Sequence, residues 1–249
     1  MRAAALTYLG TLAYAQGDST RAQEVYQDAL TLRRGLGDNP GIAKSLNNLG
    51  NVALAVGEYA RASAWYEESR AICEQSGDTA GRAMVLNNLG VVARAQGDQA
   101  RALVLYEECC RLYRELGDNW RAAVTLTNLG NVTSALGELE RAQSLYRESL
   151  TMRRDLGDRQ GIVLTLLGLG HLAHRQGLNE RAARLLAVSA VLGNQIGVAL
   201  PSSGLAEHER IVQEIHQALG EQGSAAAWAD GGAMSIEHAI EFALDTAGK

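Results

Sequence analysis

The sequence repeats itself every 40 residues. A Leu-Gly pair marks each copy, with its glycine at Gly10, Gly50, Gly90, Gly130 and Gly170. An Arg-Ala pair follows each of these glycines at one fixed distance, and a tyrosine follows the pair in the first four copies. Because unrelated segments would not share several columns over five copies, the chain is predicted to be a repeat protein whose neighbouring repeats stack into one continuous core.

Each repeat is predicted to fold as two helices. In the second repeat, the apolar and small residues of the first helix share one face, at Leu46, Leu49, Gly50 and Ala53. Gly57 then ends that helix, since glycine readily adopts the left-handed conformation of a helix C-terminus.

The second helix of the same repeat is predicted to place Ala62, Tyr66 and Ile72 inward and to end at Gly77. Asp78 is expected to cap the next helix by accepting free backbone N–H groups. The small residues let two helices approach closely, and the tyrosine ring fills the space beside them. Such a pair buries its apolar faces only by stacking on further pairs.

Composition supports a helical chain without marking a nucleic-acid or membrane partner. The 249 residues are 47% hydrophobic but only 5% aromatic, and there are 2 prolines. The formal charge is −5 with no basic block, which argues against binding to nucleic acid. Three cysteines without a CxxC pair, and no signal-like or membrane-spanning stretch, predict a cytoplasmic location.

The repeated residues resemble the tetratricopeptide repeat (TPR), whose usual period is about 34 residues. The longer repeat, its Gly-Asp ending and its missing proline are similar to the long repeats of the LGN and kinesin light chain families. The resemblance implies an all-α, right-handed superhelix (an α-solenoid) of antiparallel helix pairs with C-terminal capping helices. Repeats are expected at about 1–38, 39–78, 79–118, 119–158 and 159–197, with capping helices over 198–249.

The two ends of the array differ. The first helix has the composition of an interior helix, at Ala3, Ala4, Ala5, Leu6 and Leu9. We therefore expect that the chain is part of a longer protein, or that a partner or another copy covers this helix through self-association.

At the other end, a turn is predicted around Pro201. An amphipathic helix is then expected to turn four residues inward, Leu205, Ile211, Ile215 and Leu219, and Ser235 is expected to cap a last helix. The final segment, "LGEQGSAAAWADGGAMSIEHAIEFAL", is similar to the C-terminal ending of bacterial transcriptional regulators of the LuxR, AfsR and MalT-like type. That resemblance implies a sensor region. It brings no ATPase or DNA-binding activity, because the sequence has no P-loop motif and no helix-turn-helix segment can be placed outside the repeats.

No motif predicts catalysis or a cofactor. His171 and His174 lie three residues apart and could present two metal ligands, but no third ligand is marked. We therefore expect no metal site and an exposed polar helix face there. Cys109 is interpreted as a small packing residue. The chain is expected not to be an enzyme.

Asparagines recur on the side of the first helices opposite the apolar face, as in "LNNLGN". In stacked TPR helices that side lines a concave groove, and matching asparagines of related repeats hold an extended peptide by its backbone. The ligand-binding residues are therefore predicted to be Lys44, Asn47, Asn48, Asn51, Asn87, Asn88, Arg94, Asn128, Asn131, His171, His174 and Arg175. The alternative is that the amides bond to neighbouring repeats and set the pitch of the superhelix.

These observations predict a non-catalytic module that binds a protein or peptide in its concave groove. The module is expected to be the C-terminal sensor or interaction region of a bacterial signal-transduction regulator. Two alternatives stay open. One is a sensor that binds a small effector and controls an attached ATPase, and the other is a scaffold that self-assembles through its first helix.

Overall fold

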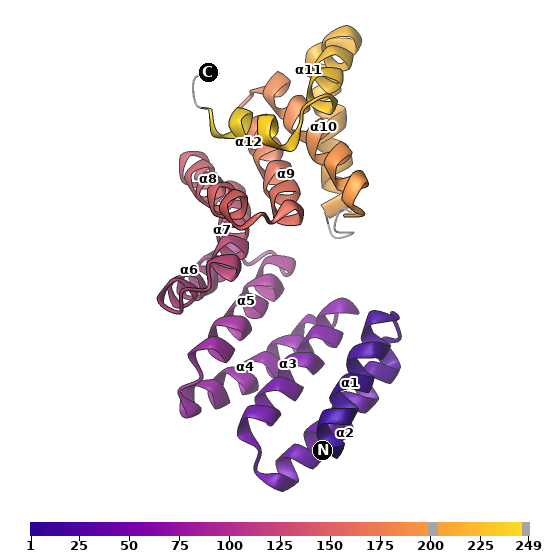
Figure 1. The fold of residues 1–249 in the computed structure, drawn as a ribbon, viewed down its shortest axis with the longest axis vertical. Coiled ribbons are helices and arrows are strands. Elements are labelled where there is room, and N and C mark those ends of the chain that lie inside the picture. Colours follow the sequence, from indigo (N-terminus) through magenta and orange to yellow (C-terminus); the bar gives the residue numbers. More distant parts are fainter. Residues whose placement is uncertain (199–203, 246–249) are drawn as a thin grey trace. The chain divides into compact units, whose positions relative to one another are not determined.

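The computed structural model describes residues 1–198 and 204–245, in which every regular element is a helix (Figure 1). The predicted all-α fold of consecutive antiparallel helix pairs is confirmed. None of the helices in this part of the chain is both long and apolar enough to cross a membrane. The turn predicted around Pro201 lies outside the described residues.

The chain forms two compact units, Met1–Asp118 and Asn119–Lys249. Unit 1 contains α1 (Arg2–Ala15), α2 (Ser19–Leu36), α3 (Asn39–Ala55), α4 (Tyr59–Ser76), α5 (Thr79–Ala95) and α6 (Gln99–Glu115). Unit 2 contains α7 (Asn119–Ala135), α8 (Leu139–Leu156), α9 (Arg159–Arg175), α10 (Asn179–Ile196), α11 (Leu205–Gly232) and α12 (Ile236–Leu244). We call α1, α3, α5, α7 and α9 the first helices of their repeats.

Helix ends follow the predicted residue types. Asp78 accepts a hydrogen bond of 2.8 Å from the backbone N–H of Gly81 at the start of α5. Gly57 and Gly77, which follow α3 and α4, have φ values of +79° and +69°. Residues with a Cβ rarely adopt such values, so these glycines stop each helix and turn the chain back.

Close packing between paired helices depends on one glycine and one tyrosine in each of the first four repeats. A Cβ added at Gly90 would lie 2.6 Å from Cε1 of Tyr106, and Gly50 meets the ring of Tyr66 in the same way. Both rings are fully buried. The predicted role of these small residues is therefore confirmed, because a methyl group at either glycine would displace the ring.

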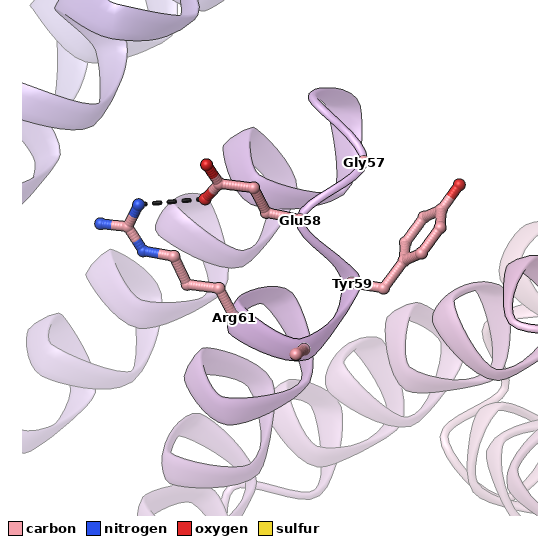
Figure 2. A pocket seen from close by; sticks show the side chains of 5 residues that line it. Gly57, Glu58, Tyr59 and Arg61 are labelled. Carbon is pink, nitrogen blue, oxygen red and sulfur yellow. Dashed lines mark hydrogen bonds and ion pairs between the residues drawn. The ribbon is translucent and has the colours of Figure 1, made fainter.

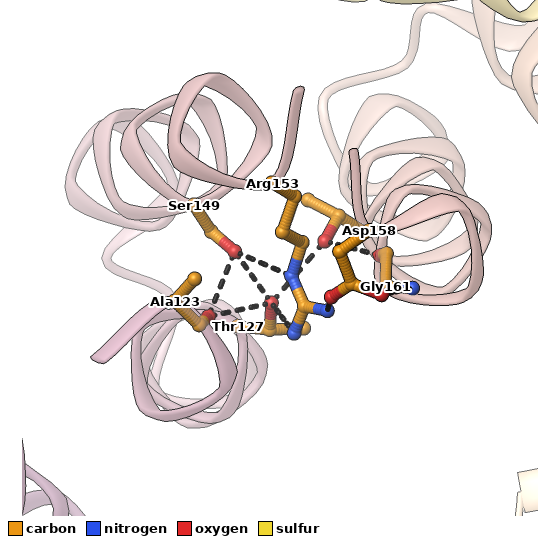
Figure 3. A network of polar contacts seen from close by, with 7 residues as sticks. Ala123, Thr127, Ser149, Arg153, Asp158 and Gly161 are labelled. Carbon is orange, nitrogen blue, oxygen red and sulfur yellow. Dashed lines mark hydrogen bonds and ion pairs between the residues drawn. The ribbon is translucent and has the colours of Figure 1, made fainter. Parts of the chain in front are cut away.

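Unit 2 contains a buried polar network beside this apolar core (Figure 3). Arg153 of α8 is only 4% exposed. Its Nη1 donates to Asp158 Oδ2 at 2.6 Å and its Nε donates to Ser149 Oγ at 3.1 Å. Ser149 also contacts the hydroxyl of Thr127 at 2.8 Å. Burial lowers the pKa of Arg153, and the carboxylate of Asp158 opposes that shift.

The predicted capping helices form α11 and α12. α11 bends at Gly220, where φ is +69°. Ile211 and Ile215 are buried against the core of unit 2, as predicted. The prediction for Leu205 is wrong, because this side chain is 40% exposed at the first turn of the helix.

The last helix is held by arginines from two earlier helices. Ser235 caps α12 by accepting a backbone hydrogen bond, as predicted. Arg147 donates to the carbonyl oxygen of Leu244 at 2.7 Å, and Arg181 donates to that of Phe242 at 2.8 Å. Both cations therefore lie at the C-terminus of α12, where the helix dipole is negative.

Candidate functional site

The predicted binding residues all belong to four of the first helices, and we call them the amide face. Unit 1 contributes Lys44, Asn47, Asn48 and Asn51 from α3, and Asn87, Asn88 and Arg94 from α5. Unit 2 contributes Asn128 and Asn131 from α7, and His171, His174 and Arg175 from α9.

Three asparagines of unit 1 bond to one another across successive first helices. Asn88 Nδ2 donates to Asn47 Oδ1 at 2.9 Å and approaches Asn51 Oδ1 at 3.3 Å. Asn47 is only 4% exposed, so the prediction that it lies on an open side is wrong. Hydrogen bonding between repeats, one of the two roles expected for the amides, is therefore present in this unit.

Two amides of the amide face, Asn51 and Asn131, are oriented by buried tyrosines. Tyr66 donates its hydroxyl proton to Asn51 Oδ1, and Tyr146 donates to Asn131 Oδ1, both at 2.7 Å. Burial raises the pKa of Tyr66, so its phenol stays protonated and remains a donor. Asn51, Asn128 and Asn131 are half-buried. The tyrosines fix the oxygen ends of Asn51 and Asn131, and neither Nδ2 has a hydrogen-bond partner among the described residues.

The rest of the amide face in unit 1 provides two cations and two further amides. Lys44 and Arg94 are exposed, and neither forms an ion pair with a described residue. Asn48 is half-buried, and its side chain has no hydrogen bond in the same part of the chain. Asn87 Nδ2 approaches Asn88 Oδ1 at 3.3 Å. Lys44, Asn48 and Arg94 are thus available to a ligand.

One repeat departs from the asparagine–tyrosine pairing. Val91 stands where the preceding repeat has Asn51, and it has no acceptor for the hydroxyl of Tyr106. This hydroxyl is buried and has no hydrogen-bond partner by distance and angle among the described residues. Burial raises the pKa of Tyr106 to about 12, and the nearby guanidinium of Arg94 partly opposes the shift.

The histidines of α9 contact α11. His171 Nε2 and His208 Nδ1 are 3.0 Å apart, and His174 Nε2 and Glu214 Oε2 are 2.9 Å apart. Burial, together with smaller contributions from the charges of His208 and His174, lowers the pKa of His171 to about 4. The prediction that His171 and His174 lie on an exposed face is therefore wrong, whereas Arg175 is exposed.

Acidic residues are confined to other parts of each repeat. The chain has 28 Asp and Glu residues, yet none lies in α1, α3, α5, α7 or α9. Every charged residue in these helices is Arg or Lys, with histidines in α9. The net charge of the whole sequence does not reveal this segregation. A count of charges at each position of the repeat does.

Two other kinds of site can be compared with the amide face, a metal site and a surface hollow. No group of three or more His, Cys, Asp or Glu residues within 1–198 and 204–245 is arranged to hold a metal ion. A hollow at the turn between α3 and α4 is lined by residues 57–61 (Figure 2). There Glu58 pairs with Arg61 at 3.0 Å, while the ring of Tyr59 points away from the pair. The amide face is therefore the better candidate for a binding site.

Several solved structures share this fold. BtubC (BKLC) from P. vanneervenii is 21% identical, with a TM-score of 0.68 over 79% of this chain and 82% of that one. The apo form of RapI is 16% identical, with a TM-score of 0.70 over 97% and 84% of the two chains. A putative kinesin light chain with nearly identical TPR-like repeats, from Podosopora anserina, is 15% identical, with a TM-score of 0.66 over 80% and 97%.

The sequence itself also matches a family model. No curated protein matches the sequence significantly. The model described as "Tetratricopeptide repeat" matches residues 1–75, 42–115 and 121–189, which together span more than half of the chain. These matches include the Leu-Gly, Arg-Ala and tyrosine columns of the first four repeats. The chain belongs to the tetratricopeptide repeat family.

Proposed function

We propose that this chain is a non-catalytic module in which each unit holds an extended segment of a partner protein in a concave groove lined by that unit's part of the amide face. The orientation of Asn51 and Asn131 carries the proposal. Each amide oxygen is held by a buried tyrosine, and each half-buried Nδ2 has no partner in the described chain. An amide N–H fixed in this way donates to a backbone carbonyl regardless of the side chains in the bound segment.

The proposal includes no catalytic step. The three cysteines are buried, and burial raises the pKa of Cys73, which is opposite to the change that activates a thiolate. The histidines of α9 bond to α11 and to Asn179. These groups stabilise the fold and are not arranged around an open cleft.

The test is peptide capture by a double variant. A library of short random peptides is selected on the native chain, and the selected peptides are titrated against Asn51→Ala combined with Asn131→Ala. We expect affinity to fall about tenfold or more, because two oriented donors are lost. Asn194→Ala, an exposed amide on α10, is the matched control. Unchanged affinity in the double variant would assign the amides to structure alone.

We further propose that the module is the cytoplasmic sensor or interaction region of a bacterial signal-transduction regulator. The similarity of the tail around Leu219, Trp228 and Ser235 to LuxR, AfsR and MalT-like regulators supports this context. A groove that binds a small effector and controls an attached ATPase is the alternative. The gene region upstream of the Met1 codon tests both, since a P-loop module encoded there would support a regulator.

Self-association through α1 is a second candidate. Tyr8, Leu9 and Leu12 are 80%, 54% and 56% exposed. The residues 40 positions after the two leucines, Leu49 and Val52, are each 1% exposed. Light scattering over a range of concentrations should show a larger species that is lost in Leu12→Asp. A monomer at every concentration would exclude this candidate.

A further inference from the structure

The surroundings of Tyr106 differ from those of Tyr66 at the residue that the hydroxyl reaches. Both rings lie in the same way, because each meets the glycine of its paired first helix, Gly90 or Gly50, through the same ring atoms. The hydroxyl of Tyr66 therefore reaches residue 51, and that of Tyr106 reaches the equivalent Val91. Valine accepts no hydrogen bond, so the hydroxyl proton of Tyr106 is left without a protein acceptor.

Arg94 does not remove this deficit. Its guanidinium lies near the phenol and partly offsets the rise in the phenol pKa. However, a guanidinium has donors and no acceptor, so Arg94 can serve only the lone pairs of the phenol oxygen. The Tyr106 O–H and the Arg94 N–H groups are then two donors beside one apolar side chain, Val91. A group that accepts two hydrogen bonds and carries negative charge complements this arrangement.

The charge pattern of unit 1 points the same way. The first helices α1, α3 and α5 contain no Asp or Glu, and Arg94 forms no ion pair with a described residue. Lys44, on the adjacent first helix, is likewise exposed and unpaired in the same part of the chain. No carboxylate of these helices therefore competes for Arg94, and the charged side chains that these helices carry are all cations, which attract an anionic ligand.

We propose that Val91, Arg94 and Tyr106 form a subsite for a carboxylate of the bound segment, which rests on the function proposed above. The carboxylate accepts a hydrogen bond from Tyr106 and pairs with Arg94, whose exposed side chain swings from the phenol to the ligand. Val91 packs against the aliphatic carbons next to the carboxylate. The carboxylate belongs either to an Asp or Glu side chain or to the C-terminus of the segment.

The experiment selects short random peptides on the full chain and on Val91→Asn, Tyr106→Phe and Arg94→Gln. On the native chain we expect enrichment of Asp or Glu at one position. Replacing that acid by Gln or Asn in a selected peptide should weaken its binding about tenfold. In the three variants the acidic and amide peptides should bind alike. Amidated and free C-termini, compared in parallel, distinguish a side-chain carboxylate from a terminal one.

Val91→Asn separates recognition from folding. It recreates the pair formed by Asn51 and Tyr66, so the variant should melt at a higher temperature while losing the preference for acidic peptides. A purely structural role would raise the melting temperature and leave the preference unchanged. Arg111→Gln is the charge control, because this exposed arginine lies on α6 and pairs with Glu115.

Two results would overturn the subsite. Peptides that need Asn51 but show no acidic preference, or keep it in Val91→Asn and Tyr106→Phe, would remove the subsite and leave the groove standing. Peptides whose binding is unaffected by loss of Asn51 and Asn131 would remove both proposals.

Discussion

In each unit a first helix contacts the helix two places later in the chain, but the chemistry of the contact differs. In unit 1, Asn88 contacts Asn51 from 37 residues away, at 3.3 Å. In unit 2, His208 contacts His171 across the same separation of 37 residues, at 3.0 Å. In both units the contact joins residues 37 positions apart, and the residue type decides whether it is ionisable.

A second pair of equivalent positions shows the same difference. In unit 1, Arg33 Nε lies 3.7 Å from Asp38, whose side chain is 46% exposed. In unit 2, Arg153 Nη1 lies 2.6 Å from Asp158, whose side chain is 14% exposed. Polar contacts in unit 2 therefore involve more deeply buried charges, and removing one partner there should have a larger effect.

The largest expected effect comes from removing Asp158. Asp38 and Asp158 cap their helices alike, accepting from the N–H of Gly41 at 3.1 Å and of Gly161 at 3.0 Å. Asp38→Ala should cost about 1 kcal/mol, mostly the lost cap. Asp158→Ala should cost about 3–5 kcal/mol, because it also leaves the buried Arg153 without its anion. Urea denaturation followed by circular dichroism measures both.

Asp158→Asn is the control for the cap. Asparagine caps helices about as well as aspartate, so this variant removes only the charge and should retain most of the loss. Equal costs for Asp38→Ala and Asp158→Ala would show that the shorter ion pair in unit 2 adds nothing to stability.

The second-largest effect is expected from low pH, which should destabilise unit 2 more than unit 1. Burial lowers the pKa of His171 to about 4 in the folded chain, against an ordinary value of about 6.5. Neutral histidine is therefore favoured by folding, and stability present above pH 6.5 is lost as pH falls toward 4. The loss in unit 2 should reach about 3 kcal/mol. Hydrogen exchange of α9 and α11, compared with α3 and α5 between pH 7 and pH 4, measures it.

His171→Asn controls for general acid effects. It replaces the titrating imidazole with asparagine, the residue at the equivalent position 51 of unit 1. Three charged residues of α11 face these histidines. Glu209 acts on His208, and Glu214, which pairs with Arg210, contacts His174. All three remain in this variant. Exchange in α9 and α11 should then become less sensitive to acid. Unaltered sensitivity would place the titrating group elsewhere.

Much of the fold could be predicted from the sequence, because the residues that determine it recur at fixed positions of the repeat. A glycine recurring opposite a tyrosine, as in Gly50 and Tyr66, predicts close helix packing without any knowledge of coordinates. Asp78 predicts a helix start by the same reasoning. These features are local, so one repeat contains all the residues that they need.

The polar partners could not be predicted in the same way. The bond from Asn88 to Asn47 depends on how two helices 41 residues apart are rotated against each other. His208 and Glu214 belong to α11, which lacks the repeated residues. Their positions beside α9 therefore could not be predicted from the 40-residue period. The buried state of Asn47 and the histidine contacts were therefore missed, whereas the face that contains them was found from periodicity.

The smallest effect is expected from removing single tyrosine hydroxyl groups in unit 1. It tests whether the second and third repeats use this hydroxyl in the same way. Tyr66→Phe removes the hydroxyl bonded to Asn51 and should cost about 1 kcal/mol. Tyr106→Phe should change stability by less than about 0.5 kcal/mol, because its hydroxyl has no acceptor in the folded chain. Both rings stay in place, so packing against Gly50 and Gly90 cancels in the comparison. Equal losses would mean that Tyr106 has found an acceptor, and the third repeat would then lack the free donor that distinguishes it from the second.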